Sequence, residues 1–170
     1  MSIKLIGAVL VLLVCGGTGY KMAANHRREV KCLQQLCAAL EHMECEMLYR
    51  LTPLPELCKR TAEVSAGSVA QFFSVLAQEL ESQVAPEVFT CVQAASWKVK
   101  NMPVHTAKVL ERFGASLGSF DMEGQLKGLA AAKEEAKQSI AQLTENQDAR
   151  LRSYQTLGLC AGASVVILFI

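Results

Sequence analysis

The sequence predicts an all-α protein, an antiparallel helical bundle of about five to six helices flanked by two membrane helices. Three observations predict this class. Apolar residues in the middle of the chain recur at spacings of three and four, as on one face of a helix. No segment shows the sustained two-residue alternation that is typical of a strand. Both ends are uncharged apolar stretches, and short connections between the helical segments favour antiparallel neighbours.

The two ends are predicted to enter the membrane. Leu5–Tyr20 has 11 apolar residues of 16, and Leu157–Ile170 has 11 of 14. With Ile3 and Lys4 the first stretch is about 27 Å long as a helix, close to the hydrocarbon thickness of about 30 Å. We therefore expect a transmembrane helix at residues 1–20, a helical bundle at 21–156, and a transmembrane or membrane-inserted helix at 157–170.

Basic residues predict the orientation. Lys21, Arg27 and Arg28 follow the first apolar segment, and Arg150 and Arg152 precede the second. Such residues stay in the cytoplasm, so the bundle is expected there. One alternative is a cleaved signal peptide, although no small-x-small site follows the segment. Arg27 and Arg28 could alternatively recognise lipid head groups instead of only orienting the membrane segment. The basic residues there are fewer than in a usual cluster that binds anionic lipids.

The first helix of the middle region is predicted from about residue 22 to 51, directly continuing the first membrane segment. Its apolar stripe consists of Leu33, Leu36, Cys37, Leu40, Met43, Met47, Leu48 and Leu51. Two prolines in Thr52-Pro53-Leu54-Pro55 end this helix and suit the first turn of the next. Thr52 is predicted to cap that next helix.

Four shorter helices should follow, at Leu54–Val64, Ser68–Val84, Glu87–Lys100 and Val104–Phe113. Pro86 and Pro103 stand near the starts of the last two, where proline is favoured. Residues 114–121 form the longest turn-like stretch. Asp121 is then expected to cap a final helix from Met122 towards Tyr154, which carries a thinner apolar stripe at Leu126, Leu129, Ile140, Leu143 and Leu151.

Composition excludes several classes of protein. The formal net charge of +1 argues against a general nucleic-acid binder, and the apolar content of 51% argues against disorder. The seven cysteines are odd in number and include no C-x-x-C pair, so we interpret them as small buried hydrophobes in a reducing compartment. Neither a phosphate-binding loop nor a dinucleotide fingerprint occurs, and we expect no cofactor.

Catalytic and metal motifs are incomplete. Gly114-Ala-Ser-Leu-Gly118 matches G-x-S-x-G, but that nucleophile elbow needs a preceding strand, so we interpret it as a helix–helix loop. His42 and Cys45 are three residues apart and would suit one metal, yet a complete ligand set is not visible. Trp97 and Tyr49 are interpreted as core or helix-edge aromatics. The chain is therefore not expected to be an enzyme.

In the second apolar segment, Gly158-x-x-x-Gly162 is a small-residue pattern that allows close contact between membrane helices. The contact would be with the first segment or with a partner helix. Glycine without a special role is the alternative, since it is frequent in membrane helices.

Four stretches carry a resemblance to a known family. They are Leu5-Ile-Gly-Ala-Val-Leu-Val-Leu-Leu, the segment from Leu40 to Glu56 with Glu41-x-x-Glu44-x-Glu46 and Thr52-Pro53-Leu54, the loop from Leu117 to Gln125, and Tyr154-Gln-Thr-Leu-Gly-Leu159. Together they resemble the stage III sporulation protein AB family over essentially the whole chain.

The resemblance implies a mother-cell membrane protein of the channel between mother cell and forespore. It implies a helical domain similar to the inner-membrane platform protein of type II secretion and type IV pilus machines, without catalytic residues. The implied partners are a secretion-type ATPase, stage III sporulation protein AA, and other membrane proteins of the channel. The positions to test first for contact with the ATPase are Glu44, Glu46, Tyr49, Arg50 and Asp121. A membrane-anchored adaptor or sensor outside any secretion system is the alternative, and the sequence leaves open whether the chain forms a homo-oligomer.

Overall fold

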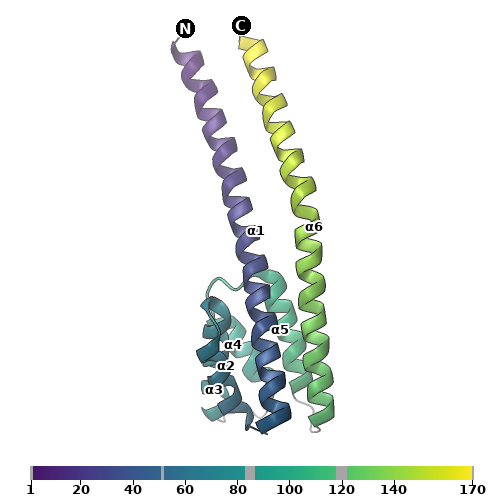
Figure 1. The fold of residues 1–170 in the computed structure, drawn as a ribbon. Coiled ribbons are helices and arrows are strands. Elements are labelled where there is room, and N and C mark those ends of the chain that lie inside the picture. The colour runs from purple at the N-terminus through teal and green to yellow at the C-terminus, as the bar shows by residue number, and fades with distance from the viewer. Residues whose placement is uncertain (1, 51, 83–86, 118–121, 170) are drawn as a thin grey trace. The chain divides into compact units, whose positions relative to one another are not determined.

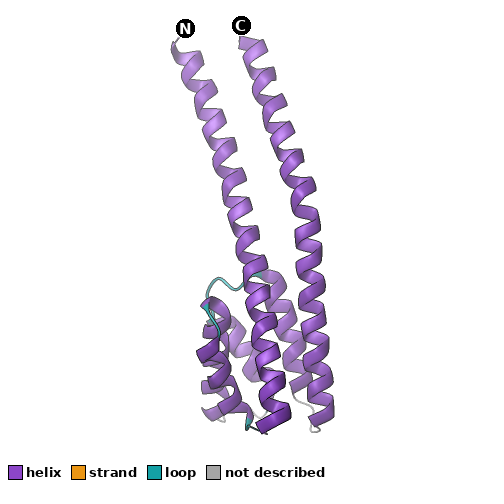
Figure 2. Ribbon diagram, in the orientation of Figure 1, coloured by secondary structure: helices purple, strands orange, loops and turns teal. Residues whose placement is uncertain are grey.

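The fold is entirely helical in the part of the chain that the structure describes. This computed structural model describes the backbone of residues 2–50, 52–82, 87–117 and 122–169, and the side chains of residues 24–50, 52–82, 87–117 and 122–145. Its helices, drawn in Figures 1 and 2, are α1 (Ser2–Arg50), α2 (Leu54–Val64), α3 (Gly67–Ser82), α4 (Val88–Lys98), α5 (Val104–Leu117) and α6 (Met122–Phe169). The predicted all-α class and helical bundle are confirmed.

The chain divides into two compact units. We call residues 29–141 the core bundle, and residues 1–28 with 142–170 the terminal pair. In the terminal pair the first part of α1 and the last part of α6 run antiparallel (Figure 1). The imidazole Nε2 of His26 lies 2.9 Å from the carbonyl oxygen of Leu143, which links these two helices.

Among the described residues, no helix contains a stretch long and apolar enough to cross a membrane. The two segments predicted to do so, Leu5–Tyr20 and Leu157–Ile170, lie outside the residues whose side chains are described, as do Gly158 and Gly162.

The second half of α1 contributes a buried stripe to the core bundle. Its members are Leu33, Leu36, Leu40, Met43 and Met47. They follow the three–four spacing that the sequence predicts. Leu48 was expected in this stripe but is 55% exposed, because it lies one helical position beyond Met47 and turns away from the core.

The other helices complete the core with aliphatic and aromatic side chains. Phe73 of α3 packs edge-to-face against Phe72 and against Phe113 of α5, with ring centroids 5.2 and 6.4 Å apart. Burial raises the pKa of the Cys58 thiol to about 12, so this cysteine behaves as a small neutral hydrophobe. Cys32 and Cys91 are buried too, which confirms the predicted burial for these three thiols, whereas Cys45 is exposed and the prediction is wrong for it.

The break between α1 and α2 falls at the predicted prolines, but the predicted cap is wrong. The helix begins at Leu54, and Pro53 is the capping position, with no side-chain hydrogen bond. The backbone N–H of Leu57 donates to the Pro53 carbonyl at 2.9 Å. Thr52 therefore stands one residue too early to cap α2.

Residues 114–117 were predicted as a turn but form the last turn of α5. The glycine there serves close helix packing instead. A Cβ atom on Gly114 would lie 2.6 Å from Cγ1 of Val92 on α4, and one on Gly128 of α6 would lie 2.1 Å from Cβ of Ser116. Both distances are shorter than carbon–carbon contact allows. The rest of the predicted turn, residues 118–121, lies outside the described residues.

Gly128→Ala should destabilise the bundle although alanine favours helix by about 1 kcal/mol over glycine. The new methyl group meets Ser116, and overpacking of this kind costs about 1–3 kcal/mol. We expect urea unfolding followed by circular dichroism to show a net loss of up to roughly 2 kcal/mol. Adding Ser116→Gly should restore part of that loss, because it removes the atoms that collide. Equal or greater stability of the single variant would disprove the close contact between α5 and α6.

Candidate functional site

Four of the five predicted contact residues lie on the last two turns of α1. Glu44, Glu46, Tyr49 and Arg50 are all described there, and Asp121 lies outside the described residues. The four side chains divide into two groups. The two glutamates are engaged with other helices of the core bundle, and the tyrosine and arginine face solvent.

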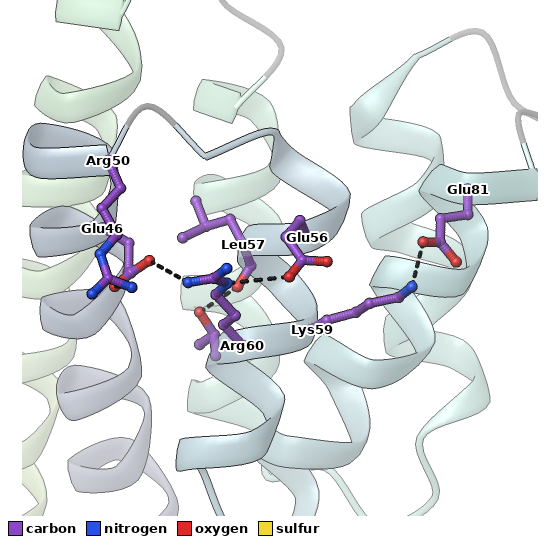
Figure 3. A network of polar contacts seen from close by, with 8 residues as sticks. Glu46, Arg50, Glu56, Leu57, Lys59, Arg60 and Glu81 are labelled. Atoms are coloured by element: carbon purple, nitrogen blue, oxygen red, sulfur yellow. Dashed lines mark hydrogen bonds and ion pairs between the residues drawn. The ribbon is translucent and has the colours of Figure 1, made fainter.

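Glu46 is the centre of a network that joins α1 to α2 (Figure 3). Its carboxylate lies 3.4 Å from Nη1 of Arg50, one turn away, and 3.5 Å from Nη1 of Arg60 on α2. The Nε–H of Arg60 also donates to Glu56 at 3.2 Å. The side chain of Glu46 is only 13% exposed. Its carboxylate therefore fixes the end of α1 against α2 and is largely covered.

Glu44 makes the corresponding link between α1 and α6. Nζ of Lys133 lies 2.6 Å from its carboxylate, and both side chains are half-buried. Hydrogen bonding to Glu44 raises the pKa of Lys133, which outweighs the opposing effect of burial. Lys133 thus stays protonated at neutral pH, and its contact with Glu44 joins these two helices.

Tyr49 and Arg50 are the predicted residues that a partner can reach. Tyr49 is 86% exposed, the side chain of Arg50 is 62% exposed, and the neighbouring Leu48 is also exposed. Leu48, Tyr49 and Arg50 are consecutive, so their side chains point in different directions around the exposed last turn and give it apolar, aromatic and cationic groups. Tyrosine and arginine are among the residue types that most often dominate binding energy at interfaces. Tyr49 was interpreted as a core or helix-edge aromatic. Its exposure shows that it is not in the core.

Sequence reasoning missed Arg60 and Lys133, which hold the two glutamates. The i,i+4 spacing of Glu56 and Arg60 was a visible signal for one half of the network. The pairing of Glu46 with Arg60 and of Glu44 with Lys133 joins separate helices. It depends on how the helices pack, which the spacing of residues along the chain does not encode.

The incomplete motifs do not form sites in the described residues. Ser116 lies inside α5, and its hydroxyl donates to the Phe113 carbonyl at 2.8 Å, so the strand–turn–helix geometry of a nucleophile elbow is absent there. Cys45 is exposed while His42 is half-buried. Among the described residues, no three metal-ligating side chains gather.

The ion pair between Glu44 and Lys133 should contribute measurably to stability. Glu44→Gln should lower the free energy of unfolding by roughly 1 kcal/mol, near the upper end for a partly exposed pair. The exchanged variant Glu44→Lys/Lys133→Glu should recover most of the loss, since it keeps opposite charges at the same positions. Urea is the suitable denaturant because it adds no ions. A double-mutant coupling near zero would show that the pair contributes nothing.

Comparison with known proteins agrees with the resemblance found in the sequence. Residues 4–170 match the family model described as stage III sporulation protein AB. A relative named stage III sporulation protein AB, from Bacillus subtilis (strain 168), is 28% identical over 168 residues, which cover 98% of each chain. A solved structure titled Stage III sporulation protein AB (SpoIIIAB) is similar with a TM-score of 0.62 and 26% identity, over 72% of this chain and 98% of that one. This chain therefore belongs to the stage III sporulation protein AB family.

Proposed function

We propose that this sporulation protein is a non-catalytic membrane platform in the channel between mother cell and forespore. In this proposal the core bundle lies in the cytoplasm and docks a secretion-type ATPase, stage III sporulation protein AA. Family membership supports the role in sporulation. The resemblance to platform proteins of secretion machines supports the ATPase as partner.

The observation that carries the docking proposal is the exposed last turn of α1. Tyr49 and Arg50 face solvent there, on a helix end whose position is fixed by buried core contacts. Glu46 and Arg60 hold this end against α2 at 3.5 Å. A surface that is already ordered loses little conformational entropy when a partner binds, and so favours affinity.

Sequence supports the membrane part of the proposal. The terminal pair brings together the two helices that carry the apolar segments, Leu5–Tyr20 and Leu157–Ile170. The basic residues that flank both segments favour a cytoplasmic bundle. In that orientation both segments would anchor the bundle, and an ATPase in the cytoplasm would reach Tyr49.

Tyr49→Ala and Arg50→Glu should weaken binding of the ATPase at least about tenfold each, as for residues that carry interface energy. The full-length chain in lipid nanodiscs would be titrated with purified ATPase. Lys127→Glu is the matched control, because Lys127 is similarly exposed but lies near the start of α6 and, among the described residues, forms an ion pair only with Glu123 of its own helix. Circular dichroism should be unchanged for all three variants.

Unchanged affinity in both variants would disprove docking at the end of α1. If even the unaltered chain failed to bind the ATPase, the adaptor or sensor reading would be favoured instead. Tyr49→Phe refines the test: it keeps the ring and removes the hydroxyl, so retained binding would assign the contact to the aromatic surface.

The native thiol of Cys45 reports the orientation of the bundle. Cys45 is exposed in the core bundle, so a membrane-impermeant maleimide should modify it only after the cells are lysed. Cys45→Ser supplies the background from the other cysteines. Modification in intact cells that disappears in Cys45→Ser would place the bundle outside the cytoplasm and remove the ATPase from its reach.

A further inference from the structure

Over most of the length of helices α3 and α4, the residues that face solvent carry no charge. The segments 67–78 and 88–97 contain no Asp, Glu, Lys or Arg. The exposed positions form one stripe on each helix, made of Gly67, Gln71, Ser74 and Gln78 on α3 and Thr90, Gln93 and Trp97 on α4. The two helices pack against each other (Figure 1), and we call the two stripes together the neutral face.

Trp97 is the most exposed large apolar residue of the neutral face. It is 88% exposed, and it is the one tryptophan in the sequence. Trp97 was interpreted as a core or helix-edge aromatic, and its exposure shows that it is not in the core. Charges border the face at its ends: Lys98 pairs with Glu79 of α3, Glu81 pairs with Lys59 of α2, and Glu87 is exposed just before α4. Trp97 is the last residue but one of α4, so the indole lies at one end of the neutral face. Exposed aromatics are enriched at interfaces, whose cores are poor in charge.

The other helices of the core bundle present charges to solvent. α2 exposes Glu56, Lys59 and Glu63, and α5 exposes Lys108, Glu111 and Arg112. When two copies of a chain meet about a two-fold axis, the same patch faces itself. Charges near the axis then meet like charges and repel. The neutral face avoids this repulsion, whereas an acidic or basic partner would find no complementary charge on it.

The polar residues of the neutral face also suit contact with their own kind. A glutamine amide holds both donors and an acceptor, and serine and threonine hydroxyls donate and accept. Gln71, Gln78 and Gln93 can therefore hydrogen-bond to the same residue types on another copy. We propose that two copies of this chain associate through the neutral face, with Trp97 of each copy packed against α3 and α4 of the other.

Trp97→Asp tests the proposal, with Val104→Asp as matched control. Val104 is 66% exposed and lies at the start of α5, outside the neutral face. Native mass spectrometry of the full-length chain in detergent micelles should find two copies for the unaltered chain and for Val104→Asp. The Trp97→Asp variant should be found as a single copy. The dissociation constant of the two-copy complex should rise at least about 30-fold, as for a residue that dominates an interface. Both side chains face solvent, so circular dichroism should not change.

Trp97 provides a second readout, because its fluorescence is not mixed with that of another tryptophan. On raising the protein concentration its emission should shift to shorter wavelength as the indole leaves water. Three results would overturn the proposal: a single copy with solvent-exposed Trp97 at every concentration, two copies that persist in Trp97→Asp, or shielding of Trp97 only after the ATPase is added. The proposal is independent of ATPase docking. The Tyr49→Ala variant should still form the two-copy complex, and the Trp97→Asp variant should still bind the ATPase.

Discussion

Burial of the second half of α1 is the constraint on which the rest of the core bundle depends. A helix with one wholly apolar stripe must cover that stripe with other elements. Contacts to this half of α1 come from four other helices, namely from Arg60 of α2, Ser68 of α3, His105 of α5 and Lys133 of α6. The packing of all four is therefore set with respect to one element, and the exposed last turn of α1 inherits its fixed position from this arrangement.

Ion pairs between helices specify which neighbours meet. Besides those on α1, Lys59 of α2 pairs with Glu81 of α3 (Figure 3), Lys98 of α4 with Glu79 of α3, and Arg112 of α5 with Glu135 of α6. Each such pair contributes at most about 1 kcal/mol at an exposed site. The buried aliphatic and aromatic side chains supply most of the stability, and the ion pairs favour one order of helices over others.

The surface of the core bundle is divided by chemistry as well as by position. The last turn of α1 carries an aromatic ring and a cation beside a network of ion pairs. The neutral face on α3 and α4 lacks charge altogether. Inside the bundle, where α4 and α5 meet, Gly114 lets Val92 approach closely. This contact depends on the small size of glycine, whereas the ion pairs between other helices depend on opposite charges. Two surfaces of such different composition suit two different kinds of contact.

Patterns along the chain were enough to predict the all-α class, the bounds of α2, most of the stripe of α1 and the family resemblance. These depend on periodicity, prolines and motifs, which act within a few residues of one another. The packed helices were needed to establish three further features. Gly114 and Ser116 belong to a helix, Glu44 and Glu46 are held by Lys133 and Arg60, and Trp97 faces solvent. Local pattern could not predict these features, because close helix contacts, ion pairs between helices and side-chain exposure depend on atoms distant along the chain. Local pattern fixes which side of a helix is apolar, and packing alone fixes what covers it.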